Sequence, residues 1–268
     1  MEKIVLFDMD GTLTPPRQQL DHSLLGPLKV LSHFCDIGVV TGSDIDYVNQ
    51  QMEKLIKYSE LRYITHILPC NGTKYYRPPS QCDDRYTLVH NNDMARELPS
   101  DCLREVFKVL TSSQADVCYH SIPLTGHFIN YRGSMINWCP IGRNANDEQR
   151  KFFVHYDTAY ERTYRDQLKE KLERTLRHKN ILKHLTVKFG GSTSFDIYPN
   201  GWDKRHCLTH FNDWETWFVG DKCEDGGNDQ ELYEHLFDEG RSFKTEDTNQ
   251  TRLIIDEQII PILLQNSE

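Results

Sequence analysis

The sequence has no apolar run approaching the roughly 18 to 20 residues needed to cross a bilayer. Basic residues are also scarce, because 31 Lys and Arg stand against 40 Asp and Glu, a formal net charge of -9 at pH 7. A broad grip on nucleic acid or an anionic membrane needs surplus positive charge, so we expect neither as a partner. Any anionic ligand must be met by a local cluster of basic side chains.

Paired cysteines are missing as well. The eight cysteines include no C-x-x-C pair and no regular spacing, which argues against a zinc site or a disulfide framework. Reduced thiols are typical of cytosolic proteins. The first residues enter a strand without the charged and apolar regions of a signal peptide. We therefore expect a cytoplasmic protein.

The order of elements predicts the fold class. Short apolar strands at 3–8, 36–40 and 65–72 alternate with helical patterns at 21–34 and about 43–55. This order is typical of a right-handed α/β fold whose ligand lies at the carboxyl ends of parallel strands. Ser43 or Asp44 is the expected N-cap of the second helix.

A second domain is predicted inside the first. Residues 77–101 are rich in turn formers and charge, and are followed by helices near 101–112, 146–156 and 160–178 with strands near 126–138 and 184–198. The strand pattern of the core returns at 216–221. We therefore predict a Rossmann-like core from 1–81 and 200–268, with an inserted α+β cap at 82–199.

Two acids follow the first strand. Asp8 stands at its carboxyl end, and Asp10 points to the same side while strand geometry lasts. Gly11 allows the tight turn that follows. Carboxylates this close repel one another, and a divalent cation such as Mg²⁺ resolves the conflict.

The stretch "FVGDKCEDGGND" repeats this arrangement, with Asp221, Asp225 and Asp229 after an apolar strand. Two acidic strand ends favour one shared metal site. The alternative is that Asp and Gly only make loops, which is the usual reason for a single stretch of this kind.

Four motifs in order resemble those of the haloacid dehalogenase superfamily of phosphotransferases: "DMDGT", "VVTGSD", the Lys of "GWDKR", and "GDKCEDGGND". The insertion between the second and third motifs resembles its C2-type cap. The resemblance implies that Asp8 is the nucleophile and Asp10 the general acid and base. It also implies that Lys204 neutralises Asp8 and phosphate, and that Thr41 or Ser43 binds a phosphate oxygen. Mg²⁺ would be held by Asp8, the backbone carbonyl of Asp10, and Asp221.

Further stretches resemble the eukaryotic phosphomannomutases: "DGTLTPPRQ", "NYRGSMINWCPIGR", Arg150 and "GGSTSFDIYPNGWDKR". Residues 127–150 carry three arginines and two acids, so they are locally positive, and arginine forks grip phosphate oxygens in pairs. In the stretch "STSFDIYP", a hydroxyl and a carboxylate share one strand face. The resemblance implies that the sugar and its distal phosphate are bound by Arg17, Arg132, Arg143, Arg150, Ser194 and Asp196. For any single arginine, the alternative is a surface ion pair.

The implied activity is interconversion of mannose 6-phosphate and mannose 1-phosphate through a phospho-aspartate, with Mg²⁺ and a hexose 1,6-bisphosphate activator. A capped sugar-phosphate phosphatase is the alternative, and a non-catalytic sugar-phosphate sensor is a third class. The resemblance leaves open a homodimer through the cap. Where family members hold a second cation, this chain has Tyr233, His235 and Asp238, so that site also stays open.

Overall fold

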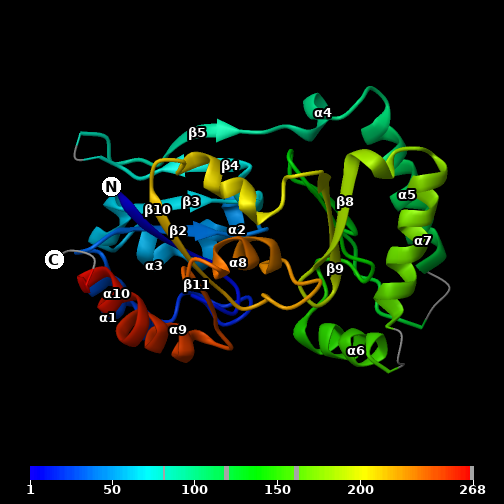
Figure 1. Cartoon of the computed structure of the whole chain (residues 1–268). Helices are drawn as coiled ribbons and strands as arrows, with labels where there is room; N and C mark the ends of the chain where they lie inside the picture. The colour runs from blue at the N-terminus through cyan, green and yellow to red at the C-terminus, as the bar shows by residue number, and fades with distance from the viewer. Residues whose placement is uncertain (81, 118–120, 160–162, 266–268) are drawn as a thin grey trace. The chain divides into compact units, whose positions relative to one another are not determined.

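The computed structural model describes residues 1–80, 82–117, 121–159 and 163–265. They form two compact units, one of Met1–Asn91 with Gly201–Glu268 and one of Asn92–Asn200 (Figure 1). The insertion begins at residue 92 rather than at the predicted residue 82, because β5 (Thr87–Asn91) pairs antiparallel with β4 (Lys74–Arg77) and belongs to the core. The predicted α/β class, with a parallel core sheet and an inserted second unit, is confirmed.

The core unit is built on a seven-stranded sheet of order β11-β10-β1-β2-β3-β4-β5. Its first five strands are parallel to one another. At one edge, β4 runs antiparallel to β3, and β5 runs antiparallel to β4. The parallel strands are β11 (Ser242–Lys244), β10 (Glu215–Gly220), β1 (Lys3–Phe7), β2 (Asp36–Val40) and β3 (Thr65–Leu68). Their carboxyl ends therefore meet at one edge of the sheet.

Side chains of β1 alternate between two apolar cores. Val5 and Phe7 join one cluster and Ile4 and Leu6 the other, all fully buried, as period-two geometry requires. Strands β2, β3 and β10 add to the first cluster. Six helical segments also contribute to it: α1 (Leu25–Leu31), α2 (Ile45–Gln51), α3 (Glu53–Ile56), α9 (Thr248–Ile254), η6 (Ile255–Ile259) and α10 (Ile260–Gln265). On the second face lie η5 (Lys204–His210) and α8 (Gln230–Phe237).

Two predicted core elements are shorter than expected. The helix predicted at 21–34 is a short 3-10 turn, η1 (His22–Leu24), followed by α1. The strand predicted to reach residue 72 ends at Leu68, and a turn, η3 (Cys70–Gly72), follows. A further turn, η2 (Glu60–Tyr63), precedes β3. Of the two predicted N-caps of α2, Asp44 takes the position and accepts the N–H of Tyr47 at 3.2 Å.

The inserted unit has an antiparallel sheet of order β6-β7-β9-β8. Its strands are β6 (Ile129–Tyr131), β7 (Ile136–Trp138), β8 (Leu185–Gly190) and β9 (Ser194–Pro199), and its helices are α4 (Met94–Glu97), α5 (Cys102–Val117), α6 (Asp147–Asp157), α7 (Tyr164–His178) and the turn η4 (Leu182–His184). Helices α5 and α7 lie side by side (Figure 1). Trp138 and Phe195 stack in its core with centroids 5.1 Å apart.

Several predicted features of the inserted unit change in extent. The helix predicted at 101–112 continues to Val117. The predicted start of the last cap helix at residue 160, and Cys118, lie outside the described residues.

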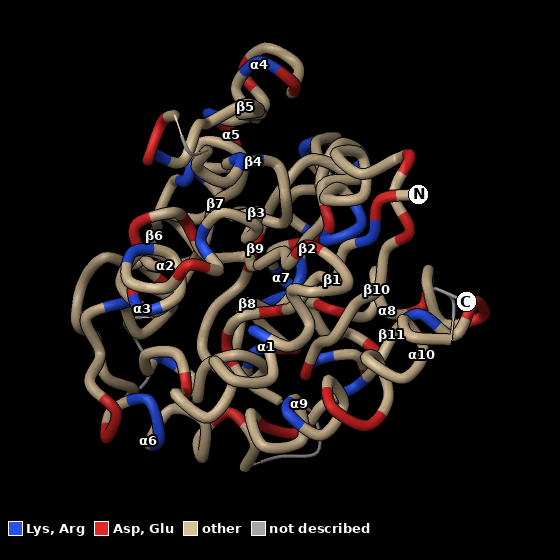
Figure 2. Tube along the Cα trace, turned by 90° about the vertical axis from the view of Figure 1, so that its left-hand side faces the viewer, with Lys and Arg blue, Asp and Glu red and all other residues tan. Residues whose placement is uncertain are grey.

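Over the described part of the chain, Lys and Arg are interspersed with Asp and Glu along the trace (Figure 2). None of the described helices combines the length and apolar character of a membrane span.

Candidate active site

Asp8 lies at the carboxyl end of β1 and is 4% exposed. Its backbone N–H donates to the carbonyl of Val219 at 2.9 Å, so it stands directly beside the end of β10. Asp221 is the first residue after β10. Parallel pairing of β1 with β10 therefore brings together two acids that are far apart in the sequence.

Lys204 joins Asp8 to a third acid. Its side chain is fully buried, and its Nζ donates to Oδ1 of Asp8 and to Oδ1 of Asp229. The other oxygen of Asp229 accepts the backbone N–H of Lys222 at 2.9 Å. Asp229 was placed in the acidic stretch by the sequence but given no role. Asp225, from the same stretch, is exposed.

Three carboxylates face one another across this site. One oxygen from each of Asp8, Asp221 and Asp229 lies within 4.8 Å of the others. Gly11 lies against the side chain of Asp221, because a Cβ built on Gly11 would lie only 2.7 Å from Cγ of Asp221. Its φ of +89° is also one that glycine adopts without strain. Hard oxygen ligands packed this closely fit a cation such as Mg²⁺.

The electrostatics of the site point to an excess of negative charge. Burial raises the pKa of Asp8 well above its usual value, with Asp229 and Asp221 adding to the effect and Lys204 opposing it. Burial and the charge of Asp229 likewise raise the pKa of Asp221. Burial alone would lower the pKa of Lys204, but Asp229 and Asp8 raise it overall, so this lysine stays protonated. The buried Lys204 and the half-exposed Lys222, which pairs with Asp221, do not balance three carboxylates, and this favours binding of a divalent cation.

Asp10 occupies a different position from the three clustered acids. Its Oδ1 accepts the backbone N–H of Arg17 at 2.9 Å. Burial raises its pKa, and the hydrogen bond from Arg17 opposes the rise. Arg17 itself is exposed, with a φ of 63°. The Asp10 carboxyl is thus held in place with a raised pKa, which suits a group that both gives and takes a proton.

Thr41 and Ser43 follow β2, the other neighbour of β1. Thr41 is 3% exposed, and its hydroxyl accepts the N–H of Ser43 at 3.1 Å. Both residues therefore lie at the sheet edge that carries Asp8.

The turn after β3 holds the helix that carries Lys204. Asn71 donates from its side chain to the carbonyl of Trp202 at 3.1 Å. A Cβ on Gly72 would lie 2.6 Å from Cα of Cys207, so only glycine allows this close approach. Sequence reasoning did not identify this support, since the contacts join segments far apart in the chain.

In the inserted unit, Asn137 joins three of the predicted sugar-binding residues. Its side-chain nitrogen donates to the Ser194 hydroxyl at 3.0 Å and to Asp196 Oδ1 at 2.7 Å. Its side-chain oxygen accepts from Arg143 at 3.0 Å. Asn137 and Asp196 are cross-strand partners on β7 and β9. Asn137 lies within the stretch "NYRGSMINWCPIGR", but the sequence alone does not predict its contacts.

The other two cap arginines lie on separate elements. Arg150, in the first turn of α6, donates to the Thr193 hydroxyl at 2.8 Å and to the carbonyls of Ala145 and Arg143, each at 3.0 Å. Arg132 follows β6 in a hairpin and is 7% exposed. Its guanidinium lies 3.6 Å from the sulfur of Met135.

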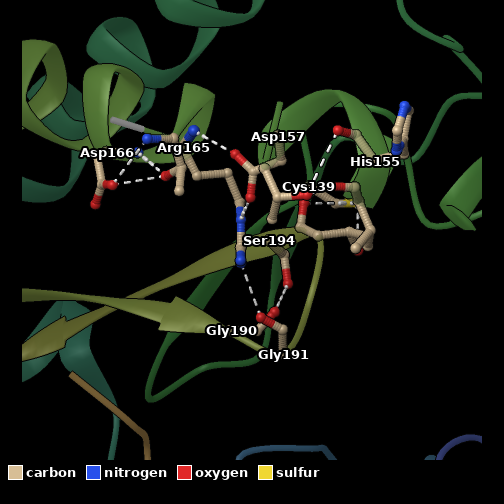
Figure 3. Close-up of polar contacts among 12 residues, drawn as sticks. Cys139, His155, Asp157, Arg165, Asp166, Gly190, Gly191 and Ser194 are labelled. Atoms are coloured by element: carbon tan, nitrogen blue, oxygen red, sulfur yellow. Dashed lines mark hydrogen bonds and ion pairs between the residues drawn. The ribbon is translucent and has the colours of Figure 1, made fainter. Parts of the chain in front are cut away.

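A further arginine supports the strand that carries Ser194. Arg165 donates from Nε to Asp157 Oδ2 at 2.7 Å and from Nη1 to the carbonyl of Gly191 at 2.8 Å. The Ser194 hydroxyl donates to the neighbouring carbonyl of Gly190 (Figure 3). Arg165 therefore ties α6 and α7 to the turn between β8 and β9.

At the positions where the resemblance leaves a second cation site open, two of the three side chains are exposed. His235 and Asp238 are exposed on α8 and just after it. The carbonyl of Tyr233 accepts the Ser242 hydroxyl at 2.8 Å.

The fold, the acids that follow its strands and Lys204 at the start of η5 define a member of the haloacid dehalogenase superfamily. Within it, the chain belongs to the eukaryotic phosphomannomutase family, whose family model matches residues 25–259. The chain is 35% identical over 233 residues to a phosphomannomutase of Dendrobium officinale, covering 86% of this chain and 84% of that one. It is 34% identical to a phosphomannomutase of Arabidopsis thaliana, covering 86% and 87%.

Solved structures of low sequence identity share the fold. An IMP-bound, N-terminally truncated IMP-nucleotidase of Plasmodium falciparum aligns with a TM-score of 0.61 at 14% identity, covering 95% of this chain and 67% of that one. A trehalose-6-phosphate phosphatase related protein aligns with a TM-score of 0.54 at 15% identity, covering 99% and 100%.

Proposed function

We propose that this chain is a phosphomannomutase that interconverts mannose 6-phosphate and mannose 1-phosphate. The main support for this proposal is the buried Lys204. It donates hydrogen bonds to Asp8 and Asp229 at the edge of the sheet where Asp221 also lies. Membership of the family adds the substrate class.

Asp8 is the proposed nucleophile. A carboxylate oxygen attacks the phosphorus of a hexose 1,6-bisphosphate, forming an aspartyl phosphate as the bond from phosphorus to the sugar oxygen breaks. Asp10 gives its proton to the departing sugar oxygen. Lys204 stays charged between Asp8 and Asp229, and so offsets negative charge at the reacting carboxylate.

The second half-reaction runs the same chemistry in reverse. Asp10 takes the proton from a hydroxyl of the bound hexose monophosphate, whose oxygen attacks the phosphorus and frees Asp8. The resulting bisphosphate turns round, so that its other phosphate faces Asp8. Transfer of that phosphoryl group to Asp8, with the sugar oxygen taking a proton from Asp10, releases the other monophosphate and restores the aspartyl phosphate. Thr41 and Ser43 are proposed to bind oxygens of the transferring phosphoryl group.

Mg²⁺ is the proposed cofactor, held by Asp8, Asp221 and the backbone carbonyl of Asp10. When bound, it would offset negative charge on the phosphoryl group and the acids around it. The close approach of Gly11 to Asp221 and the clustered oxygens support this assignment.

The inserted unit is proposed to hold the phosphate that does not react. Arg143 and Arg150 are anchored beside Ser194 and Asp196 through Asn137 and Thr193. Together with Arg132 they would grip a phosphate and the sugar hydroxyls. Arg17 of the core unit is proposed as a further sugar-binding residue.

The cell compartment and any partners are also proposals. All seven cysteines among the described residues are free, which supports a cytoplasmic location. A homodimer through the cap remains a prediction.

Phosphorus-31 NMR of the full chain tests this function. With mannose 1-phosphate, Mg²⁺ and a trace of hexose 1,6-bisphosphate, we expect a growing mannose 6-phosphate signal. Release of inorganic phosphate without a need for bisphosphate would instead identify a phosphatase. The Asp8→Asn variant is the control and should do neither. Retained biological function in that variant would point to a sensor.

A further inference from the structure

Three histidines of the core unit form a cluster that the proposed reaction does not use. His90 is near the end of β5, while His206 and His210 lie four residues apart on η5. One ring nitrogen from each lies within 4.8 Å of the others. The ring of His90 is 4.9 Å from that of His210 and 6.0 Å from that of His206, measured between centroids.

Two of the three histidines, His210 and His90, each keep a ring nitrogen that can accept a cation. Nε2 of His210 lies 2.8 Å from the carbonyl of Gly72, so it carries the proton and donates, and Nδ1 keeps its lone pair. Metal-binding histidines are commonly oriented in this way by a backbone carbonyl. Within the described residues, Nε2 of His90 is shielded from solvent and has no hydrogen-bonding partner. A buried polar atom left in this state is costly unless something binds it.

Two of the three rings, those of His206 and His210, are buried enough to disfavour their charged forms. Burial, with His210 and His90 beside it, lowers the pKa of His206 to about 4, and Asp203 opposes the shift only in part. Burial also lowers the pKa of His210, aided by His90 and opposed by the Gly72 carbonyl. Asp203 is itself paired with Arg205 at 2.8 Å. Near neutral pH these two histidines are therefore uncharged, which is the form that binds metals.

We propose that His90, His206 and His210 form a site for a borderline transition-metal cation, with Zn²⁺ the best match. Neutral imidazoles suit zinc, copper, nickel and iron, whereas Mg²⁺ prefers oxygen, so this site is chemically distinct from the acidic one. Tetrahedral zinc takes nitrogens at about 2.0–2.1 Å, with water as a fourth ligand. One nitrogen of each ring already lies within 4.8 Å of the others, so binding would draw the three rings closer together. A site made of three histidines needs none of the cysteine pairs that the sequence lacks.

The site has a structural consequence within the core unit. The first core segment ends at Asn91, directly after His90, and the second begins at Gly201, just before η5. A cation bound by the three histidines would tie β5 to η5, the helix that begins with Lys204. It would therefore fix both places where the chain leaves and re-enters the core, and would steady the helix that bears Lys204.

Calorimetric titration of the chelator-treated full chain with Zn²⁺, in excess Mg²⁺, tests the proposal. We expect one zinc per chain, a raised melting temperature, and affinity at least about tenfold weaker in His206→Gln and His90→Gln. The exposed His33→Gln is the matched control and should bind as the unaltered chain does. Equal affinity in all four proteins, or no binding by the unaltered chain, would overturn the site.

Crystals of the unaltered chain grown with Zn²⁺ give a readout that does not depend on how the variants fold. An anomalous peak among the three imidazole rings supports the site. A zinc peak elsewhere, such as at the exposed Cys82, or no peak at all, refutes it.

Discussion

Gly11 and Asp221 approach so closely that no side chain fits between them. A Cβ on Gly11 would lie 2.7 Å from Cγ of the Asp221 carboxylate, and the φ of Gly11 is +89°. The loop after β1 can therefore lie against the acid that follows β10 only because position 11 carries no side chain. This contact sets the spacing of the acidic site.

Replacing this glycine should damage the site rather than the fold as a whole. In Gly11→Ala, the added methyl must push Asp221 aside, and the left-handed backbone adds strain of roughly 1–2 kcal/mol. We expect mutase activity to fall at least about tenfold, with a higher Mg²⁺ requirement. Gly240→Ala is the control, since Gly240 has a φ of 66° and open space around it. Equal losses in the two variants would show that strain alone is responsible.

Loss of Lys204 should destabilise the core. In Lys204→Met, Asp8 and Asp229 remain buried without their common partner, a cost of about 3–5 kcal/mol in the free energy of unfolding. Urea unfolding measures it. Lys222→Met is the comparison, because Lys222 is paired with Asp221 at 3.1 Å but is 55% exposed, and should cost under about 1 kcal/mol. Similar losses would mean that the buried pairing is unimportant.

Arg165 provides a parallel test in the inserted unit (Figure 3). Its partner Asp157 has a side chain only 2% exposed. In Arg165→Ala this buried carboxylate loses its guanidinium and keeps, among the described residues, only the backbone N–H of residue 165, at a cost of about 3–5 kcal/mol in the free energy of unfolding. Arg104→Ala, which breaks an exposed pair with Asp101, should change stability little. Thermal unfolding of both variants checks this, and an Arg165→Ala protein as stable as the control would contradict it.

The histidine cluster predicts a pH dependence of stability in metal-free protein. The pKa of His206 is about 4 in the folded chain against an ordinary 6.5, because burial and its histidine neighbours disfavour its charge. The unfolded chain therefore binds the proton first as the pH falls. The contribution of neutral His206 to the folding stability is fully present above pH 6.5 and is lost as the pH drops towards 4. The decline should be smaller in His206→Gln, and equal slopes would refute this origin.

Much of the core site could be predicted because its signals are local. Asp8, Asp10 and Gly11 follow a single apolar strand, and the stretch around Asp221 repeats that pattern. Parallel pairing then determines where these acids meet. The partnership of Lys204 with Asp229 was missed because it depends on how η5 packs, which no local spacing encodes.

Local spacing also fails to encode the other features that the sequence did not predict. Asn137 reaches Ser194 and Asp196 only through the register of β7 with β9. The insertion was placed too early because β5 exposes Leu88 and Val89 and lacks the pattern of a buried strand. His90 meets His206 and His210 across more than a hundred residues of intervening chain.

The proposed mutase reaction depends most on Asp8 carrying the phosphoryl group. Rapid acid quenching of the full chain mixed with Mg²⁺ and hexose 1,6-bisphosphate, followed by peptide mass spectrometry, observes this directly. We predict one added phosphoryl group on the peptide containing Asp8, and none in Asp8→Asn. Conversion of the sugar phosphates with no phosphorylated peptide, or with the group on another residue, would contradict the account.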